Sequence, residues 1–156
     1  MNHLLSIEKR NSVLNRMAKI LEQERANLKA INQQDLNNYT GDDLAMEKRL
    51  LVDDAKIDGM ILSLQQLASQ EDPIGVERFH FVHDNGIKIT NKTAAFGTIM
   101  IIYESRPDVP VEAVEFAFKP GTKILFKAGQ ASFGINSKIL VFCLQALIDN
   151  NVAIFW

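Results

Sequence analysis

Apolar and polar residues alternate along the first half of the chain with the spacing of amphipathic helices. From Leu14 to Ile31 the apolar positions lie three or four residues apart, or at multiples of those steps (Leu14, Met17, Leu21, Leu28 and Ile31). Ser6 is a suitable N-cap for this helix. Asp53 can cap a second helix, whose apolar face comprises Ile57, Met60, Ile61, Leu64 and Leu67. The polar stretch 37–43 predicts a loop between the helices, and Pro73 ends the second one.

The pattern then changes to that of a β-hairpin. Two strand-like runs, 76–83 and 87–93, flank Asp84-Asn85-Gly86, and Asn-Gly favours the type I′ turn of a tight hairpin. The second run alternates apolar and polar residues, which predicts a half-buried strand. We expect a group of three aromatic residues in and after the hairpin to belong to the core (Phe79, Phe81 and Phe96).

The last third predicts strands alternating with helices. An almost continuous apolar run, 96–103, suits a strand covered on both faces. A helix beginning near Pro110, a short strand at 123–127, a helix at 132–149 and a third strand at 152–156 follow in that order. This order is half of a doubly wound nucleotide-binding fold. Ligands in such sheets bind outside the carboxyl ends of the strands, which directs attention to the loops at 104–108 and 128–131.

The predicted fold is therefore α/β and organised in three parts. Residues 1–75 form an N-terminal helical segment, 76–94 the hairpin, and 95–156 a partial, Rossmann-like βαβαβ nucleotide-binding region. The chain ends inside an apolar strand with no following helix to cover it. We therefore expect it to be a truncated form or one half of an assembly.

Charge and cysteine content narrow the classes of function. The net charge is −2 and Lys and Arg are scattered, which argues against nucleic-acid or acidic-membrane binding. A single cysteine cannot form an internal disulfide, and this suits a reducing compartment. The apolar run at the N-terminus is too short for the hydrophobic region of a signal peptide, and no apolar stretch is long enough to predict a membrane span. A cytoplasmic, soluble protein is expected.

The loop after the first strand of the last third contains the most specific candidate chemistry. Arg106 just past a buried strand can bind a carboxylate or phosphate through two parallel hydrogen bonds, and Glu104 and Ser105 add an acceptor and a hydroxyl. The alternative interpretation is an ordinary surface loop with a salt bridge.

The only thiol, Cys143, has a functional and a structural interpretation. It could serve as a nucleophile, but its neighbours Leu140, Val141, Phe142 and Leu144 place it in an apolar helix, where cysteines are inert core residues. We interpret Cys143 as structural. The three histidines do not form a metal set, because His80 and His83 point to opposite faces of a strand and no Cys or carboxylate cluster accompanies them.

Several segments together resemble one enzyme family. The run 97–109, Gly-Thr-Ile-Met-Ile-Ile-Tyr-Glu-Ser-Arg-Pro-Asp-Val, closely resembles the signature of γ-glutamyl phosphate reductases, members of the aldehyde dehydrogenase superfamily. The segments 32–36 (Asn-Gln-Gln-Asp-Leu), 71–75 (Glu-Asp-Pro-Ile-Gly) and 85–89 (Asn-Gly-Ile-Lys-Ile) resemble further family motifs in the same order and spacing. The resemblance runs from about residue 7 to the end and covers less than half of a family member.

The resemblance implies an activity and a first site. The family reduces L-glutamyl 5-phosphate to L-glutamate 5-semialdehyde with NADPH in proline synthesis; a thiolate displaces phosphate and the thioester accepts hydride. The family's nucleophile lies beyond this chain, so no catalytic residue is expected here. Glu104, Ser105, Arg106 and Pro107 should border the substrate side of the nicotinamide pocket. Ser105 is expected nearest the reacting carbonyl, and Arg106 either binds substrate anion or holds the loop.

The resemblance also implies a second, cofactor-binding site. Lys127, Gly129 and Ser132 match family positions that border the adenosine and phosphate of NADPH, and Asn136 matches an asparagine in the next helix. Two positions depart from the family. Ala128 replaces a glycine, and its Cβ penalises a positive φ or a close phosphate approach. Gln130 replaces a lysine that favours a 2′-phosphate.

Three hypotheses follow from these residues. The chain is an inactive, truncated form of the reductase, or a non-catalytic nucleotide-binding or interaction module derived from it, or a degenerate fragment held folded by a partner. Glutamyl phosphate is the substrate implied by the family. The partner is either a second copy of the chain or a complementing fragment.

Overall fold

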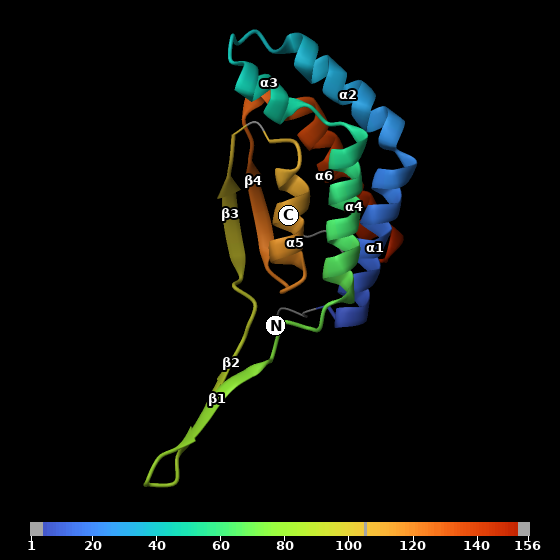
Figure 1. Ribbon diagram of the computed structural model, residues 1–156. Coiled ribbons are helices and arrows are strands. Elements are labelled where there is room, and N and C mark those ends of the chain that lie inside the picture. The colour runs from blue at the N-terminus through green and yellow to red at the C-terminus, as the bar shows by residue number, and fades with distance from the viewer. Residues whose placement is uncertain (1–4, 105, 153–156) are drawn as a thin grey trace.

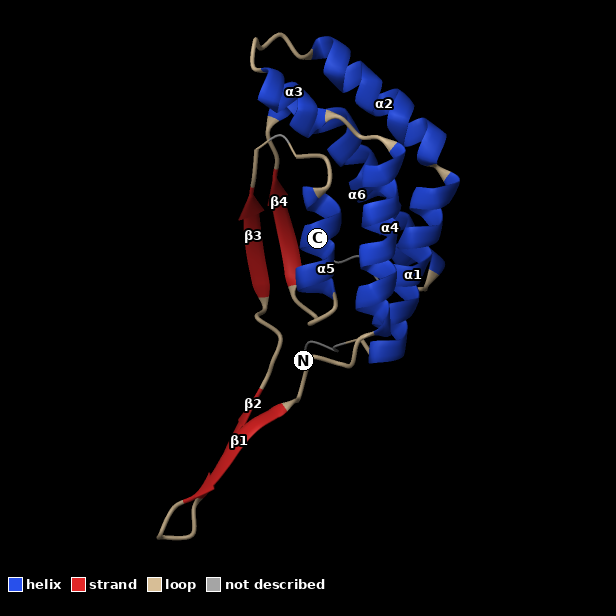
Figure 2. Cartoon of the chain, in the orientation of Figure 1, coloured by secondary structure: helices blue, strands red, loops and turns tan. Residues whose placement is uncertain are grey.

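The computed structural model describes residues 5–104 and 106–152. Within them the chain forms an α/β fold of helices, one antiparallel hairpin and one parallel strand pair, as predicted (Figures 1 and 2). The elements are α1 (Ile7–Gln23), α2 (Arg25–Asn38), α3 (Leu44–Leu50), α4 (Asp54–Ser69), β1 (Glu77–Val82), β2 (Lys88–Lys92), β3 (Thr98–Ile102), α5 (Val109–Phe118), β4 (Lys123–Lys127), the 3₁₀ turn η1 (Gln130–Ser132) and α6 (Phe133–Asp149).

The helix starts follow the predicted caps. The Ser6 side chain accepts a hydrogen bond from Lys9 N at 3.3 Å, and Asp53 accepts one from Lys56 N at 2.8 Å. Asp43 caps α3 in the same way, accepting from Ala45 N at 2.8 Å. The sequence did not predict α3, because a helix of seven residues with a single buried side chain has no readable period.

The predicted first helix is in fact two helices. α1 ends at Gln23 and α2 begins at Arg25, with the backbone of Glu24 outside the helical region. Leu21 of α1 and Leu28 of α2 are both fully buried, so their apolar spacing continues across the break. Periodicity alone therefore does not reveal the change in direction.

The last third contains the predicted strand–helix–strand unit. β3 and β4 pair in parallel, with Thr98 opposite Lys123 and Ile102 opposite Lys127, and α5 connects them. α6 ends in a Schellman motif: Asn151 has φ 54°, its N–H donates to Ile148 O, and the N–H of Val152 donates to Leu147 O. Of the predicted third strand, residues 153–156 lie outside the described residues.

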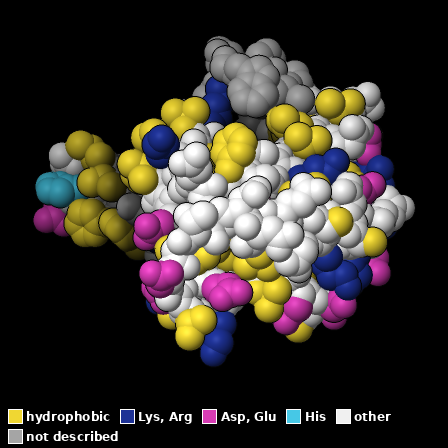
Figure 3. Space-filling model, turned by 90° about the horizontal axis from the view of Figure 1, so that it is seen from above, with side chains coloured by type: hydrophobic (Ala, Val, Ile, Leu, Met, Phe, Trp, Pro, Cys, Tyr) yellow, Lys and Arg dark blue, Asp and Glu magenta, His cyan; other side chains and the backbone are white. Residues whose placement is uncertain are grey.

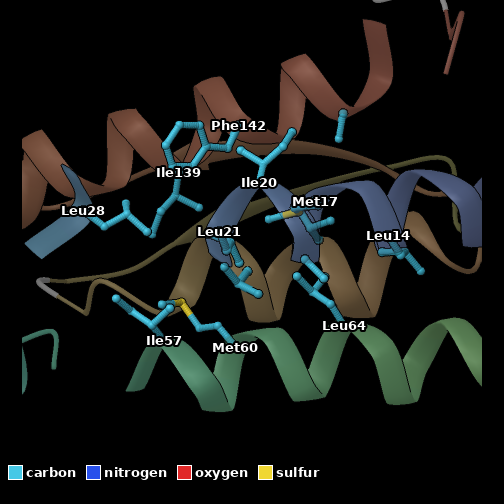
Figure 4. Packing of buried hydrophobic residues seen from close by; sticks show 14 of the residues in the cluster. Leu14, Met17, Ile20, Leu21, Leu28, Ile57, Met60, Leu64, Ile139 and Phe142 are labelled. Carbon is cyan, nitrogen blue, oxygen red and sulfur yellow. The ribbon is translucent and has the colours of Figure 1, made fainter. Parts of the chain in front are cut away.

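One hydrophobic core joins the first and last segments. α1 lies between α4 and α6, and Leu14, Met17 and Leu21 are almost completely buried there. Figure 4 shows them packed with residues from the neighbouring helices (Leu28, Ile57, Met60, Leu64, Ile139 and Phe142). The helices of segment 1–75 thus pack directly on those of segment 95–156.

The hairpin, by contrast, projects away from this body (Figure 1). Every residue of β1 and β2 is exposed, so the expectation of a half-buried strand is wrong for this chain. The aromatic residues expected in the core are exposed as well: Phe79 by 56%, Phe81 by 51% and Phe96 by 84%. Phe79 and Phe81 alternate with polar residues as in a half-buried strand, but the described residues leave about half of each side chain uncovered.

The hairpin turn also differs from the type I′ prediction. Gly86 N donates to His83 O at 2.8 Å and Gly86 has φ 85°, but Asn85 does not have a positive φ. A type I′ turn requires positive φ at both central residues. The loop is instead a three-residue connection that ends in a left-handed glycine, and His83 N donates to Ile87 O to close it.

The β3–β4 sheet is covered on one face only. Ile124 and Phe126 face the helices and pack on the core, whereas Met100, Ile102 and Leu125 face away and are 57–73% exposed. The prediction that the first strand is covered on both faces is therefore wrong for the described residues. Seen from above, acidic and basic side chains are interspersed over the surface, with hydrophobic side chains between them (Figure 3).

One described helical stretch, Gln130–Asp149, has the length and composition to cross a membrane. Its apolar character has another explanation in this fold. Ile135, Ile139 and Ala146 are fully buried, and α6 packs against α1 and α2. One face of α6 thus belongs to the core, although only 33% of the most apolar window of this stretch is buried.

Candidate functional site

The two loops singled out in the sequence lie at the same edge of the β3–β4 sheet. β3 and β4 end together, because Ile102 stands opposite Lys127 and Tyr103 N donates to Lys127 O at 3.0 Å. Parallel strands place their carboxyl ends at one edge, and ligands of open α/β sheets bind there. The fold thus brings loop 104–108 beside loop 128–131.

Arg106 holds its own loop against the start of α5. Its guanidinium Nη2 lies 2.9 Å from Asp108 Oδ2 and 3.0 Å from Glu112 Oε1. The hydrogen bond and charge of Asp108 raise the pKa of Arg106, so the group stays cationic. Half of the side chain is still exposed. This geometry agrees with the loop-holding alternative, and binding of a substrate anion stays a prediction.

The other residues of the signature loop are divided between surface and interior. Glu104 is exposed, and its carbonyl oxygen accepts a hydrogen bond from Arg106 N at 2.6 Å. Pro107 is buried beneath the loop. Ser105, the residue expected nearest the reacting carbonyl, lies outside the described residues.

Tyr103 ends the strand in an apolar setting. Its ring meets Phe126 edge to face at 6.4 Å between centroids, and its buried hydroxyl has no hydrogen-bond partner among the described residues. Burial raises the pKa of Tyr103 to about 12, so the phenol is neutral at physiological pH. A buried hydroxyl without a partner is destabilising, which makes this position a candidate contact for a group outside the described residues.

The second loop exposes Lys127 at the end of β4. Gly129, the residue before η1, has φ −72°, and Ala128 has no positive φ. The backbone strain expected from a Cβ at Ala128 is therefore not present. Alanine in place of the family's glycine is therefore accommodated here without backbone strain.

Ser132 and Asn136 are bonded to each other. Asn136 Nδ2 donates to Ser132 Oγ at 2.8 Å, and both residues are buried, with exposures of 2% and 0%. The bond braces the first turn of α6. In this arrangement almost none of the surface of either residue is accessible to a ligand, and their contact with a cofactor stays a prediction.

Two residues of the Asn32–Leu36 motif join α2 to distant segments of the chain. Asn32 is buried; its Nδ2 donates to Leu50 O and its Oδ1 accepts from Val52 N, each at 2.7 Å. Asp35, one helical turn later, reaches the N-terminus of α6. The motif is a structural brace between α2 and two distant segments. Sequence reasoning noted the motif but not what it touches.

Sequence reasoning missed a buried cluster of charge. Arg10 is 2% exposed, bonds Asp72 Oδ2 at 2.6 Å and donates to the carbonyl oxygen of Lys119. Lys119, also 2% exposed, donates through Nζ to Leu67 O and Gln70 O, two carbonyl oxygens at the C-terminal end of α4. Burial opposes ionisation of Asp72, but the bonds from Arg10 and a backbone N–H outweigh it and lower its pKa. The cluster ties α1, α4 and α5 together.

Cys143 lies in the core side of α6. Its Sγ is 3.6 Å from Met17 Sδ, and burial raises the pKa of the thiol to about 12. A thiol with that pKa is protonated at neutral pH and is a poor nucleophile. The described residues contain no group of three or more His, Cys, Asp or Glu side chains placed to hold a metal ion.

Comparison with known proteins gives a consistent picture. No family model matches the chain. γ-Glutamyl phosphate reductases from Aliarcobacter butzleri and Shewanella denitrificans are each 33% identical over 150 residues, which cover 95% of this chain and 36% of the relative. The chain thus spans about a third of the length of these relatives.

Solved structures agree with the sequence comparison. Crystal structures of γ-glutamyl phosphate reductase from Thermotoga maritima and Saccharomyces cerevisiae match 93% of this chain, both with a TM-score of 0.86, at 28% and 25% identity. The match covers 36% and 38% of those chains. A propionaldehyde dehydrogenase from Clostridium phytofermentans shares the fold at 12% identity, with a TM-score of 0.60 over 96% of this chain and 31% of its own. In sequence and in fold, the chain corresponds to the N-terminal portion of γ-glutamyl phosphate reductases.

Proposed function

We propose that this chain is the N-terminal portion of a cytoplasmic γ-glutamyl phosphate reductase, an enzyme that reduces L-glutamyl 5-phosphate to L-glutamate 5-semialdehyde with NADPH in proline biosynthesis. One observation supports this above all others. The similarity to named reductases extends over 95% of the chain in sequence and 93% in fold. It includes the signature loop at the ligand-binding edge of the sheet.

Within that enzyme the chain contributes one side of the active-site pocket. Loop 104–107 borders the substrate, with Arg106 fixed by Asp108 and Glu112 and half of its side chain free to face an anion. Lys127 ends the neighbouring strand and is exposed. Two cations at one edge suit a substrate and a cofactor that both have phosphate groups.

The residues present fit NADPH in part. Lys127 and Gly129 are accessible and lie at the edge where a nucleotide binds in such folds, whereas Ser132 and Asn136 are engaged with each other. When bound, NADPH supplies the hydride. The chain's own contribution is to neutralise charge through Lys127 and to orient loop 128–131.

These 156 residues do not supply the nucleophile. Cys143 is their only cysteine, and its thiol is protonated in the core. We expect the purified chain to show no NADP-dependent oxidation of glutamate 5-semialdehyde at any pH from about 6 to 9, the range in which an activated thiolate reacts. The expectation would be contradicted if the chain turned over substrate faster than a no-protein blank and if Cys143→Ser abolished that turnover.

Thermal unfolding with NADPH tests the cofactor proposal. A ligand that binds only the folded state adds about 2.7 kcal/mol at a hundredfold excess over Kd, so the melting temperature should rise by several degrees. Lys127→Ala should reduce the shift. Lys123→Ala is the matched control, since Lys123 is exposed at the opposite end of the same strand and should leave the shift unchanged.

A second candidate function is a non-catalytic nucleotide-binding or interaction module. The exposed apolar residues of the hairpin and of the open sheet face favour an interaction role, either with a second copy of the chain or with a complementing fragment. The same melts separate nucleotide binding, which both candidates allow, from the interaction role. A shift that depends on Lys127 supports nucleotide binding, and no shift in a cooperative melt supports interaction alone.

A further inference from the structure

The N-terminus of α6 lies where a doubly wound fold commonly holds a ligand phosphate. α6 follows β4, which ends at Lys127, and loop 128–131, and the first N–H groups of a helix have no partner within the helix. Those free donors and the positive end of the helix dipole attract anions. The usual expectation is therefore a phosphate at this helix start.

In this chain the donors are already occupied by a carboxylate. Asp35 Oδ1 accepts from Gly134 N at 3.2 Å, and Asp35 Oδ2 accepts from Ile135 N at 2.8 Å. The local N-cap, Ser132, makes no side-chain bond to the helix backbone; its hydroxyl accepts a bond from the Asn136 side chain instead. The anion at this helix start therefore comes from α2, 100 positions before Ile135.

Gly134 is adapted to that carboxylate. A Cβ at position 134 would lie 2.6 Å from Asp35 Oδ1, a distance at which atoms overlap. Gly134 does not have a positive φ, so the glycine is not needed for its backbone conformation. Close approach of Asp35 is the physical reason for a glycine in the first turn of this helix.

We propose that Asp35 is a specificity-determining residue, whose carboxylate takes the place of a ligand phosphate at the start of α6 and closes it to anions. Anion recognition at this edge then falls to Lys127 and Arg106; that second step rests on the proposed reductase function, but the closure itself does not. Asp35 also fixes the loop between β4 and α6 by joining α2 to it.

Titration with inorganic phosphate, followed by the amide resonances of the labelled chain, tests the closure. In the wild type the Gly134 and Ile135 amides should not respond, whereas in Asp35→Ala they should shift saturably. Saturable shifts of these amides in the wild type would overturn the proposal, and so would their failure to shift in a folded Asp35→Ala protein. Because the titration does not use NADPH, its failure would leave the reductase proposal intact. Failure of the reductase proposal would likewise leave this result intact.

Substitution of glycine provides a second test that does not require Asp35→Ala to fold. Gly134→Ala should lower the melting temperature of the wild type because its Cβ meets the Asp35 carboxylate. Gly59→Ala in α4 is the matched control, since a Cβ there meets nothing within 4 Å and the melting temperature should hold or rise. If Gly134→Ala is as well tolerated as Gly59→Ala, the close approach of Asp35 is refuted.

Discussion

At the scale of single residues, the polar groups of the interior are the most informative. Glu115 on α5 is 8% exposed; its Oε2 accepts a hydrogen bond from Ser63 Oγ at 2.6 Å, and its Oε1 has no partner among the described residues. Burial raises the pKa of Glu115 above its ordinary value of 4.5, and the nearby charge of Glu112 adds to the effect. The native state therefore holds this proton more tightly than the unfolded state.

This gives a signed pH dependence. Because the pKa of Glu115 is higher in the folded than in the unfolded protein, its protonation stabilises the fold. This contribution is complete below about pH 4.5 and is lost as the pH rises through the pKa of the folded state. Glu115→Gln removes the ionisation and should stabilise the protein at pH 7 by about 1 kcal/mol, with little effect at pH 4. Urea unfolding at both pH values measures the difference.

A matched substitution separates burial from simple loss of charge. Glu112→Gln removes a carboxylate that is 45% exposed on the same helix and should change stability by less than about 0.5 kcal/mol. If Glu115→Gln destabilises the protein at pH 7, the carboxylate is better satisfied than the described contacts indicate.

At the scale of elements, the same kind of sequence pattern leads to opposite degrees of burial. α1 and the hairpin strands both alternate apolar and polar residues at the period of their secondary structure. Leu21 of α1 is fully buried between neighbouring helices, whereas Phe81 of β1 is 51% exposed. The hairpin is thus held by its own strand pairing and by its junction with the body.

This contrast predicts unequal costs of truncation. Leu21→Ala should destabilise the chain by about 2–5 kcal/mol, the usual range for a buried leucine. Phe81→Ala should change global stability by no more than about 0.5 kcal/mol, because it removes few contacts of the folded state. Chemical denaturation of the two variants provides the measurement. A cost above about 2 kcal/mol for Phe81→Ala would show that the hairpin is covered in solution.

At the scale of the whole molecule, one core organises what the sequence divides into segments. Arg10 near the N-terminus contacts Asp72 and Lys119 at the end of the sheet where β4 begins, and Asp35 contacts α6 at the other end, so residues far apart in sequence hold the body together. The body is closed around α1, but the outer face of β3–β4 and the hairpin are left with exposed apolar side chains. These surfaces are where the remaining two thirds of a reductase, or a partner, would pack under the proposed function.

The sequence by itself determined the local structure of this protein. Ser6, Asp53 and Pro110 act through contacts or backbone preferences within a few residues, so the starts of α1, α4 and α5 were readable, as was the strand–helix–strand order. The family resemblance likewise rests on contiguous motifs, such as that ending at Arg106 and Pro107.

Only the tertiary structure decided which side chains are buried and what they touch. Phe79 and Met100 have the pattern of core residues but are exposed, because burial requires a second element that local pattern does not specify. Ser132 and Asn136, the residues that the resemblance implies as cofactor contacts, bond each other, and Asp35 reaches a helix 100 positions away. Such contacts depend on how helices pack in three dimensions, and no local spacing of residues encodes that geometry.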